Sequence, residues 1–362
     1  MRTRVLIFTL CAVILAAYIF RIINTNNSFV TVERAAMGMN TLMSIEAEMP
    51  KDTAEKALEG AFLILRELND AFSRYNKNSD ISRINIAAGS EYVRVGRDTW
   101  LILESSLRFA DLTDGFFDPT VGPLTDLWRI TAAGIWAPPT EEQISEARKL
   151  VGYREISLVS QDMVRLNLEG STLDLGAVAK GYAADRVAEY LKNNGARSGV
   201  LDFGGDLMLF GTRKIDSKAV PWRIGVKHPS PSEAGRENIV CTLSFTLSPG
   251  ETLSFATSGS YERFRAYRGR RLSHIFDPHT GLPIETNLIS VSVIDPLAVR
   301  ADAVSTAFLG MGEHRAREII SRFPDMEAVF VHLEDDKAKV SATEGLRGKI
   351  RLVDESASLE IF

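Results

Sequence analysis

The chain has 362 residues, of which 45% are hydrophobic and 25% are charged. These proportions are typical of a globular protein that buries a sizeable core, and they exclude a disordered or fibrous chain. The 42 Lys and Arg residues against 47 Asp and Glu residues leave a net charge of −5. Because no Lys/Arg-rich run with interleaved aromatic residues occurs either, we expect no nucleic-acid partner.

The N-terminus has the pattern of a membrane-targeting segment. Arg2 and Arg4 precede an almost unbroken apolar run, Val5–Phe20. Basic residues before an apolar stretch are typical of a secretory signal whose basic end stays in the cytoplasm. No small-x-small cleavage site follows, so we expect residues 1–28 to form an uncleaved anchor and linker. It would carry residues 29–362 as one domain outside the cytoplasmic membrane, and a cleaved signal peptide is the alternative.

The two cysteines, Cys11 and Cys241, do not indicate a disulfide. Cys11 lies inside the apolar run and lacks the small residue that normally precedes a lipidated cysteine. CxxC and HExxH spacings are absent and the five histidines are scattered, so the sequence predicts no structural zinc site.

The spacing of apolar residues and the turn signals predict a chain in which strands outnumber helices. Thr140 and Gln143, for example, fit a capping box at the start of a helix. Strands that do not alternate regularly with helices indicate an α+β fold, with mixed or antiparallel sheets and packed helices after the anchor. In chain order the predicted elements are strand residues within Phe29–Met49, a helix over Thr53–Asn76, a helix over Thr99–Leu112, a helix over Thr140–Leu150, strands at Glu155–Leu158 and Val164–Leu168, a helix over Ala183–Asn194, strands at Gly199–Leu201, Trp222–Val226, Ile239–Phe245, Leu253–Ala256 and Ile289–Ile294, helices over Ala301–Met311 and Glu313–Arg322, and a strand at Ala328–Leu333.

The segment Leu173–Tyr182, L-D-L-G-A-V-A-K-G-Y, combines a strand-like start, small residues and a helix that begins near Lys180. A helix N-terminus favours anions because its N–H groups are unpaired and its dipole is positive there. Lys180 adds a full positive charge, and Asp174 offers a hydrogen-bond acceptor to a neutral part of a ligand. A strand–turn–helix corner with ordinary surface charges is the alternative interpretation of this segment alone.

A second group of polar residues lies in Arg300–Gly312, R-A-D-A-V-S-T-A-F-L-G-M-G. In a helix, Asp302, Ser305 and Thr306 stand at i, i+3 and i+4 and therefore share one face. A carboxylate and two hydroxyls are hard oxygen ligands of the kind that magnesium prefers, with phosphate oxygens and water completing its shell. A helix turn with a packed hydroxyl pair is the alternative, so the metal interpretation depends on a phosphate site beside it.

Three further regions carry candidate residues. His274 precedes a strong turn signal, and a histidine can act as a general base near neutral pH. Phe116, Phe117 and Asp118 could line a pocket for a flat aromatic ring, although a turn and core role is the alternative. The regions are Ser273–Gly281 (S-H-I-F-D-P-H-T-G), Asp114–Trp128 (D-G-F-F-D-P-T-V-G-P-L-T-D-L-W), and Phe72–Tyr75 (F-S-R-Y) with Asp80–Asn85 (D-I-S-R-I-N).

Taken together, eight motifs resemble the FAD:protein FMN transferase family, often called ApbE. They extend from about Met39 to Gly312, which is nearly the whole chain after the N-terminal segment. Eight collinear motifs with family-like spacing are highly specific. The motifs are M-N-T-L-M-S-I, F-S-R-Y, D-I-S-R-I-N, F-D-P-T-V-G-P-L, L-D-L-G-A-V-A-K-G-Y-A-A-D, A-T-S-G-S-Y-E-R, H-I-F-D-P-H-T-G and A-D-A-V-S-T-A.

The resemblance implies a Mg²⁺-dependent enzyme that splits the pyrophosphate of FAD. FMN would be attached through a phosphoester bond to a threonine or serine of a target flavoprotein, and AMP would leave. Typical targets are subunits of membrane redox complexes of the sodium-translocating quinone reductase and Rnf types. The resemblance also implies an anchor in a bacterial inner membrane with the catalytic domain on the periplasmic side.

Two other activities use the same motifs. An exported FAD-binding protein without transfer activity would need the pocket but no metal ligands, so the intact pair Asp302 and Thr306 weighs against it. An FAD pyrophosphatase, in which water replaces the acceptor hydroxyl, would use the same residues and stays open.

The resemblance further implies roles for single residues. FAD would contact Met39, Tyr75, Phe116, Phe117, Asp118, Asp174 and Lys180, with Ile275 or Phe276 close by. Magnesium would be held by the Ala177 backbone carbonyl, Asp302 and Thr306, with Ser305 adjacent. The catalytic residues would be His274, which accepts the proton of the acceptor hydroxyl, together with Lys180 and Asp302.

Two positions depart from the family pattern. Asn40 stands where the family usually has the glycine of Met-Gly-Thr, although the earlier pair Met37-Gly38 leaves the register open. Ser260 stands where the family often has Asp. Because Asn40 brings a side chain to a place that glycine keeps open, we expect a changed FAD affinity or a changed fit of the bound adenine.

Overall fold

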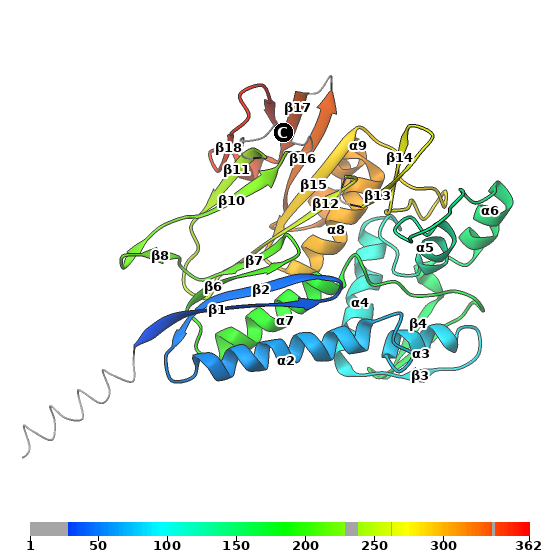
Figure 1. Cartoon of the computed structure of the whole chain (residues 1–362), viewed down its shortest axis with the longest axis horizontal. Helices are drawn as coiled ribbons and strands as arrows, with labels where there is room; N and C mark the ends of the chain where they lie inside the picture. Colours follow the sequence, from blue (N-terminus) through cyan, green and yellow to red (C-terminus); the bar gives the residue numbers. More distant parts are fainter. Residues whose placement is uncertain (1–27, 229–237, 262, 335–336) are drawn as a thin grey trace, which may run out of the picture.

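A computed structural model of the chain describes residues 28–228, 238–261, 263–334 and 337–362 (Figure 1). The predicted anchor or signal peptide, with Cys11, falls on residues 1–27 and so lies outside the described residues. Among the helices that are described, none combines the length and the apolar character needed to cross a membrane. The second cysteine, Cys241, is a buried free thiol.

A nine-stranded sheet forms the centre of the molecule (Figure 1). Its neighbouring strands pair antiparallel, except that the last pair is parallel. In spatial order the strands are β1 (Phe29–Gly38), β2 (Thr41–Pro50), β6 (Ser198–Phe203), β7 (Asp206–Phe210), β12 (Thr252–Gly259), β15 (Leu288–Asp295), β16 (Glu327–Glu334), β17 (Lys337–Ala342) and β19 (Ser358–Ile361).

Smaller sheets and the helices surround this sheet. The smaller sheets pair β10 (Trp222–Lys227) with β11 (Ile239–Phe245) and β18 (Ile350–Leu352), β13 (Phe264–Tyr267) with β14 (Arg270–Ser273), β3 (Val93–Arg94) with β5 (Met163–Leu166) and β4 (Ile156–Val159), and β8 (Lys214–Ile215) with β9 (Lys218–Ala219). The α-helices are α2 (Ala54–Phe72), α3 (Asp80–Ile86), α4 (Arg97–Leu112), α5 (Gly122–Trp128), α6 (Glu141–Lys149), α7 (Ala179–Asn193), α8 (Ala298–Met311) and α9 (Glu313–Ile319). The 3₁₀ turns are η1 (Tyr153–Glu155), η2 (Ile320–Arg322) and η3 (Glu344–Leu346).

Side chains alternate between the two faces of a strand, and on the central strand β16 both faces are buried. On β16, Val329 and Val331 join the apolar cluster that contains residues of β10 and β11. Ala328 and Phe330, between and beside them, join the cluster that contains residues of α8 and α9. The sheet of β10, β11 and β18 therefore covers one face of the central sheet, whereas α2, α7 and α8 cover the other (Figure 1). This arrangement confirms the predicted α+β fold with mixed sheets and packed helices.

The hairpin between β1 and β2 turns at Met39 and Asn40, which have φ values of 48° and 61°. Asn tolerates this left-handed region better than most residues and is favoured in two-residue hairpin turns. The backbone N–H of Met39 donates to Asn69 Oδ1 of α2 at 3.0 Å, which ties the turn to the helix. Asn40 itself is exposed, so its replacement of the family's usual glycine is compatible with the turn.

Several predicted helix boundaries differ from the observed ones; α8, for example, begins at Ala298 rather than at residue 301. Helix α2 ends at Phe72 rather than at residue 76, and α7 begins at Ala179 rather than at residue 183. The predicted helix over residues 313–322 is divided into α9 and the 3₁₀ turn η2. The capping box at Thr140 is present, since its hydroxyl accepts from the Gln143 N–H and the Gln143 side chain accepts from the Thr140 N–H.

Candidate active site

Helices α7 and α8 cross in direct backbone contact at Gly181. A Cβ atom built on Gly181 would lie 2.2 Å from the carbonyl oxygen of Ala298 and 2.8 Å from Cβ of Asp302. Only glycine leaves room for this approach. The N–H of Gly181 donates to Asp302 Oδ2 at 2.9 Å, so a carboxylate of α8 satisfies a donor in the first turn of α7.

Lys180 lies beside this crossing and is held by two carboxylates. Its Nζ is 2.9 Å from Asp206 Oδ2 and 3.1 Å from Asp302 Oδ1. Burial by itself opposes the ammonium charge, but the two carboxylates outweigh burial and raise the pKa of Lys180 above its usual range. Burial raises the pKa of Asp206 to about 6, against the opposing effect of Lys180. The site therefore keeps a full cation at neutral pH.

Asp206 is the residue of this cluster that sequence reasoning missed. It begins β7, directly after Gly204 and Gly205 in the turn from β6. Its Oδ1 accepts from the N–H of Thr257 on β12 at 3.0 Å, which fixes the carboxylate between two strands. The sequence did carry a signal for Asp206, because a carboxylate directly after a strand and two glycines lies in a turn, and binding residues are often found in such turns.

The hydroxyl cluster predicted on α8 is present and is larger than predicted. Ser305 and Thr306 share a face with Asp302, and both hydroxyls meet Ser258 of β12. The Ser258 hydroxyl oxygen is 2.9 Å from Ser305 Oγ and 3.0 Å from Thr306 Oγ1. The Ser305 hydroxyl also donates to the Asp302 backbone carbonyl at 2.9 Å.

The oxygen atoms near Lys180 could serve as ligands of a hard divalent cation. Asp302 supplies a buried carboxylate, and Thr306 and Ser258 supply hydroxyls. Within the described part of the chain, the Gly181 N–H donates to Asp302 rather than to the Ala177 carbonyl, its partner in a regular helix, which frees that carbonyl for another donor or a metal. The described residues contain no group of three or more His, Cys, Asp or Glu arranged to hold a metal. This donor set suits Mg²⁺, which is typically bound through one or two carboxylates plus phosphate oxygens and water.

Asp174 is anchored by Arg74, a half-buried arginine that the sequence motifs contained but did not single out. Arg74 NH1 is 2.8 Å from Asp174 Oδ2, and Arg74 NH2 is 2.6 Å from Asp126 Oδ2. Burial opposes the charge of Arg74, but the two carboxylates outweigh burial and raise its pKa. Asp174 Oδ1 accepts from the Gly176 N–H at 3.0 Å. Both of its oxygens therefore have partners, and the loop that leads into α7 is held in place.

His274 follows β14 and points one ring nitrogen at a backbone carbonyl. Its Nδ1 is 2.9 Å from the carbonyl oxygen of Arg263, which assigns the proton to Nδ1 and leaves Nε2 as an acceptor. Burial lowers the pKa of His274, and the charges of Lys180 and Asp174 also act on it, in opposite directions. His274 is thus neutral at pH 7 and belongs to the same electrostatic environment as the α7 motif.

Three of the predicted flavin contacts, Met39, Tyr75 and Phe116, are exposed or half-buried. Tyr75 is exposed, and its ring lies 5.8 Å from the guanidinium carbon of Arg74. Phe116 packs edge-to-face on His279, with ring centroids 4.7 Å apart. These side chains are accessible to a ligand, as is the half-buried Met39 in the β1–β2 turn.

Phe117 and Asp118 are buried, and Ile275 is half-buried. Asp118 Oδ1 accepts from the N–H and the hydroxyl of Thr120, and its Oδ2 accepts from the N–H of Tyr153. The carboxylate thus holds the turn that follows Phe116. The Ile275 carbonyl accepts from the Ile284 N–H at 3.0 Å.

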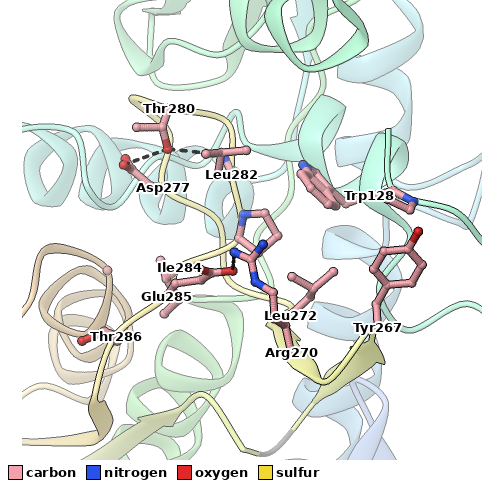
Figure 2. A pocket seen from close by; sticks show the side chains of 13 residues that line it. Trp128, Tyr267, Arg270, Leu272, Asp277, Thr280, Leu282, Ile284, Glu285 and Thr286 are labelled. Atoms are coloured by element: carbon pink, nitrogen blue, oxygen red, sulfur yellow. Dashed lines mark hydrogen bonds and ion pairs between the residues drawn. The ribbon is translucent and has the colours of Figure 1, made fainter. Parts of the chain in front are cut away.

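A cavity of about 500 Å³ lies beside α8 and the turn after His274 (Figure 2). Its lining includes the rings of Trp128 and Tyr267 and, from α8, Gly310. An ion pair between Arg270 and Glu285 borders it. None of the predicted site residues lines this cavity, so it is an additional concave surface next to the candidate site.

The arrangement has one consistent chemical use. Lys180 places an ammonium group at the crossing of α7 and α8, where two carboxylates share its charge. Carboxylate and hydroxyl oxygens beside Lys180 suit a divalent cation that accompanies phosphate. A neutral histidine with a free Nε2 suits proton abstraction.

Comparison with known proteins identifies the family of the chain. The model of the ApbE family matches residues 39–330. A Vibrio cholerae protein named FAD:protein FMN transferase is 33% identical over 71% of this chain and 73% of its own length. A Treponema pallidum protein of the same name is 30% identical over 90% of this chain and 91% of its own length.

Solved structures of this family share the fold. The crystal structure of an ApbE protein from Thermotoga maritima has a TM-score of 0.73 and 31% identity, and covers 84% of this chain and 94% of its own. The flavin transferase ApbE from Vibrio cholerae has a TM-score of 0.75 and 28% identity, and covers 89% of this chain and 100% of its own. The chain therefore belongs to the ApbE family.

Proposed function

We propose that this chain is an FAD:protein FMN transferase. Its substrate would be FAD, from which FMN passes to a threonine or serine hydroxyl of a target protein while AMP leaves. The observation that carries the proposal is the Lys180 ammonium held between Asp206 and Asp302 where α7 and α8 cross. The names of the Vibrio cholerae and Treponema pallidum relatives support the same activity.

The residues of the crossing account for binding of the pyrophosphate. The ammonium group of Lys180 would face its anionic oxygens. Asp302, Thr306 and the Ala177 carbonyl would hold Mg²⁺, with Ser305 and Ser258 beside them. Bound there, Mg²⁺ would neutralise charge on phosphate oxygens. Breaking the pyrophosphate bond also requires the attacking hydroxyl oxygen to be in line with the departing AMP, and groups fixed at the helix crossing would hold the phosphorus atom for that attack.

His274 accounts for removal of the acceptor proton, and the aromatic residues account for binding of the flavin ring. The Nε2 atom of His274 would take the proton from the acceptor hydroxyl as its oxygen attacks phosphorus. Tyr75, Phe116 and Met39 would contact the isoalloxazine ring, whose flat surface suits stacking on aromatic side chains. Asp174 stays fixed by Arg74 and would accept a hydrogen bond from the flavin side of FAD.

The partners and the location complete the proposal. The acceptor proteins would be flavoprotein subunits of membrane redox complexes of the quinone reductase or Rnf type. The enzyme would be anchored in a bacterial inner membrane with its catalytic domain on the periplasmic side. The apolar run Val5–Phe20 behind Arg2 and Arg4 supports this location.

The deciding experiment uses the full chain, FAD, Mg²⁺ and a candidate acceptor subunit. We expect the acceptor to gain the mass of covalent FMN while AMP appears in equal amount. The Asp302→Ala variant should retain its circular dichroism spectrum but lose this product, since it lacks the carboxylate shared by Lys180 and the metal site. Free FMN and AMP with no modified acceptor would instead indicate an FAD pyrophosphatase, and unchanged transfer by Asp302→Ala would contradict the assigned site.

A further inference from the structure

Helix α8 has no cap of its own at its N-terminus. The residue before it is Leu297, whose side chain cannot accept a hydrogen bond. The first N–H groups of a helix have no partner within the helix and need one from elsewhere. Here the partner is Asp185 of α7: its Oδ1 accepts from the Ala298 N–H and its Oδ2 from the Val299 N–H, both at 2.9 Å.

The same arrangement exists in the opposite direction. Helix α7 follows Val178, which provides no side-chain cap either. The Gly181 N–H, in the first turn of α7, donates to Asp302 Oδ2 of α8. Each helix therefore supplies the carboxylate that caps the other, and the two capped residues Gly181 and Ala298 are also the ones in close contact.

This reciprocal capping determines where the reactive groups stand. Lys180 precedes Gly181 by one residue, and Asp302 lies one helical turn after Ala298. A slide or rotation of α8 against α7 would break the two bonds of Asp185 and would move Asp302 away from Lys180 at the same time. Among the described residues, the hydrogen bonds of Asp185 go to Ala298 and Val299 and not to Lys180 or the hydroxyl cluster, so its effect on them passes through the helix register.

Asp185 occupies this position at an electrostatic cost. Burial raises its pKa to about 7, although the bonds from Val299 and Ala298 favour the charged carboxylate. The nearby charges are Asp295, which also raises the pKa, and Lys192, which lowers it. Asp295 is paired with Arg300 at 2.7 Å and accepts from the Leu297 N–H at 2.8 Å, so the approach to α8 retains a second anchor when Asp185 is replaced.

We propose that Asp185 is a positioning residue of the transferase site, which sets the register of α8 on α7 and so aligns Asp302 with Lys180. The activity arm of its test rests on the proposed function, and a second arm does not. The chemistry of the side chain matters because a carboxylate accepts from both N–H groups. An amide of the same shape accepts from one and presents its own N–H₂ to the other.

The first arm compares Asp185→Asn with Asp98→Asn in the full chain. Asp98 is the matched control: it is also a carboxylate tied to α7, accepting from Tyr182 and Arg186, but it lies on α4 and makes neither contact with α8. We expect Asp185→Asn to lower kcat for FMN transfer at least about tenfold with the KM for FAD within about twofold, since small misplacement of reacting groups lowers rate steeply. Asp98→Asn should leave kcat near the wild-type value. Equal losses in both variants, or wild-type kcat in Asp185→Asn, would overturn the proposal.

The second arm measures amide hydrogen exchange on the same proteins without FAD or metal. In Asp185→Asn we expect faster exchange at Ala298 and Val299, and also at Gly181, whose acceptor Asp302 is unchanged in sequence. Faster exchange at the first two amides with Gly181 unaffected would show a purely local cap and refute the register role. A chain that does not transfer FMN at all would refute the proposed function while leaving this arm valid.

A second substitution covers the case in which the Asn variant does not fold. Asp185→Glu keeps the charge and moves the carboxylate by one methylene, so it should lower kcat and speed exchange at Gly181 in a folded protein. If Asp185→Glu keeps the wild-type kcat and the wild-type rate of amide exchange at Gly181, the proposal is contradicted.

Discussion

His274 has the protonation state that a general base needs. Its Nδ1 proton is committed to the Arg263 carbonyl, and burial lowers its pKa below the ordinary value of 6.5. A base acts in its neutral form, so lowering the pKa extends the active form toward acid pH. The charge of Asp174, which acts in the other direction, is weaker than the effect of burial.

The first prediction follows from the lowered pKa of His274. We expect kcat for FMN transfer to fall as the pH drops through the pKa of His274, with a midpoint below pH 6.5. His274→Ala should remove this acid limb and lower kcat by about 10²- to 10⁴-fold, the usual range for a lost general base. His314→Ala, which changes a histidine exposed on α9, is the control and should keep the wild-type profile. An unchanged rate in His274→Ala would remove the residue from the mechanism.

At the residue scale, local motifs identify the site only in part. Lys180, Asp302, Ser305 and Thr306 could be singled out because each group lies within one short segment, and the structure brings these segments together. Their partners Asp206 and Ser258 come from other strands. Such partners are chosen by strand pairing and helix crossing, and no spacing within one segment records either.

The same limit applies to short elements. The amphipathic spacing of α2 and α4 predicts these long helices correctly, because their buried residues recur at three- and four-residue steps. Strand β17, K-A-K-V-S-A, and the edge strand β19, S-L-E-I, contain too few apolar residues to be distinguished from loops. Helix α5 has only seven residues and begins with Gly-Pro, which in a sequence indicates a turn.

At the element scale, the α7–α8 crossing depends on one glycine, and this gives a second prediction. Gly181→Ala places a methyl group against the backbone of Ala298, which cannot move without displacing α8. Overpacking of this kind costs typically about 1–3 kcal/mol, so we expect a loss of about 2 kcal/mol in the free energy of unfolding by urea denaturation, and a larger proportional loss of activity.

Gly60→Ala is the matched control for this substitution. Gly60 also lies in a helix, α2, and the nearest atoms to its added Cβ all belong to the Tyr190 side chain: the hydroxyl oxygen at 2.0 Å and the ring carbons Cζ at 2.7 Å and Cε1 at 3.1 Å. A flexible side chain can rotate aside, and alanine improves helix propensity by about 1 kcal/mol over glycine. We therefore expect Gly60→Ala to unfold within about 1 kcal/mol of the wild type and to keep its activity. A Gly181→Ala protein with near wild-type stability and activity would show that α7 and α8 can move apart at the crossing without harm.

At the scale of the whole molecule, the described fold begins at the end of the segment that we propose as a membrane anchor. Strand β1 starts at Phe29 and pairs with β2 along its whole length, from Phe29 opposite Pro50 to Gly38 opposite Thr41. Lys51 donates from its backbone to the Ser28 carbonyl at 2.9 Å, one residue before the strand. The catalytic domain therefore takes its first sheet strand immediately after the residues that we propose as the anchor.

The third prediction separates anchoring from catalysis. A chain without residues 1–28 should leave the membrane fraction and keep the kcat of the full chain, because α7, α8 and the sheet lie wholly beyond residue 28. A chain that begins at residue 39 should aggregate, since it also lacks β1 and exposes the edge of β2, whose Ile45, Ala47 and Met49 are buried. Membrane fractionation with mass spectrometry of the N-terminus checks both. A full chain recovered in the soluble periplasmic fraction with a shortened N-terminus would mean a cleaved signal peptide. A chain without residues 1–28 that still sediments with membranes would place the membrane contact on the domain itself.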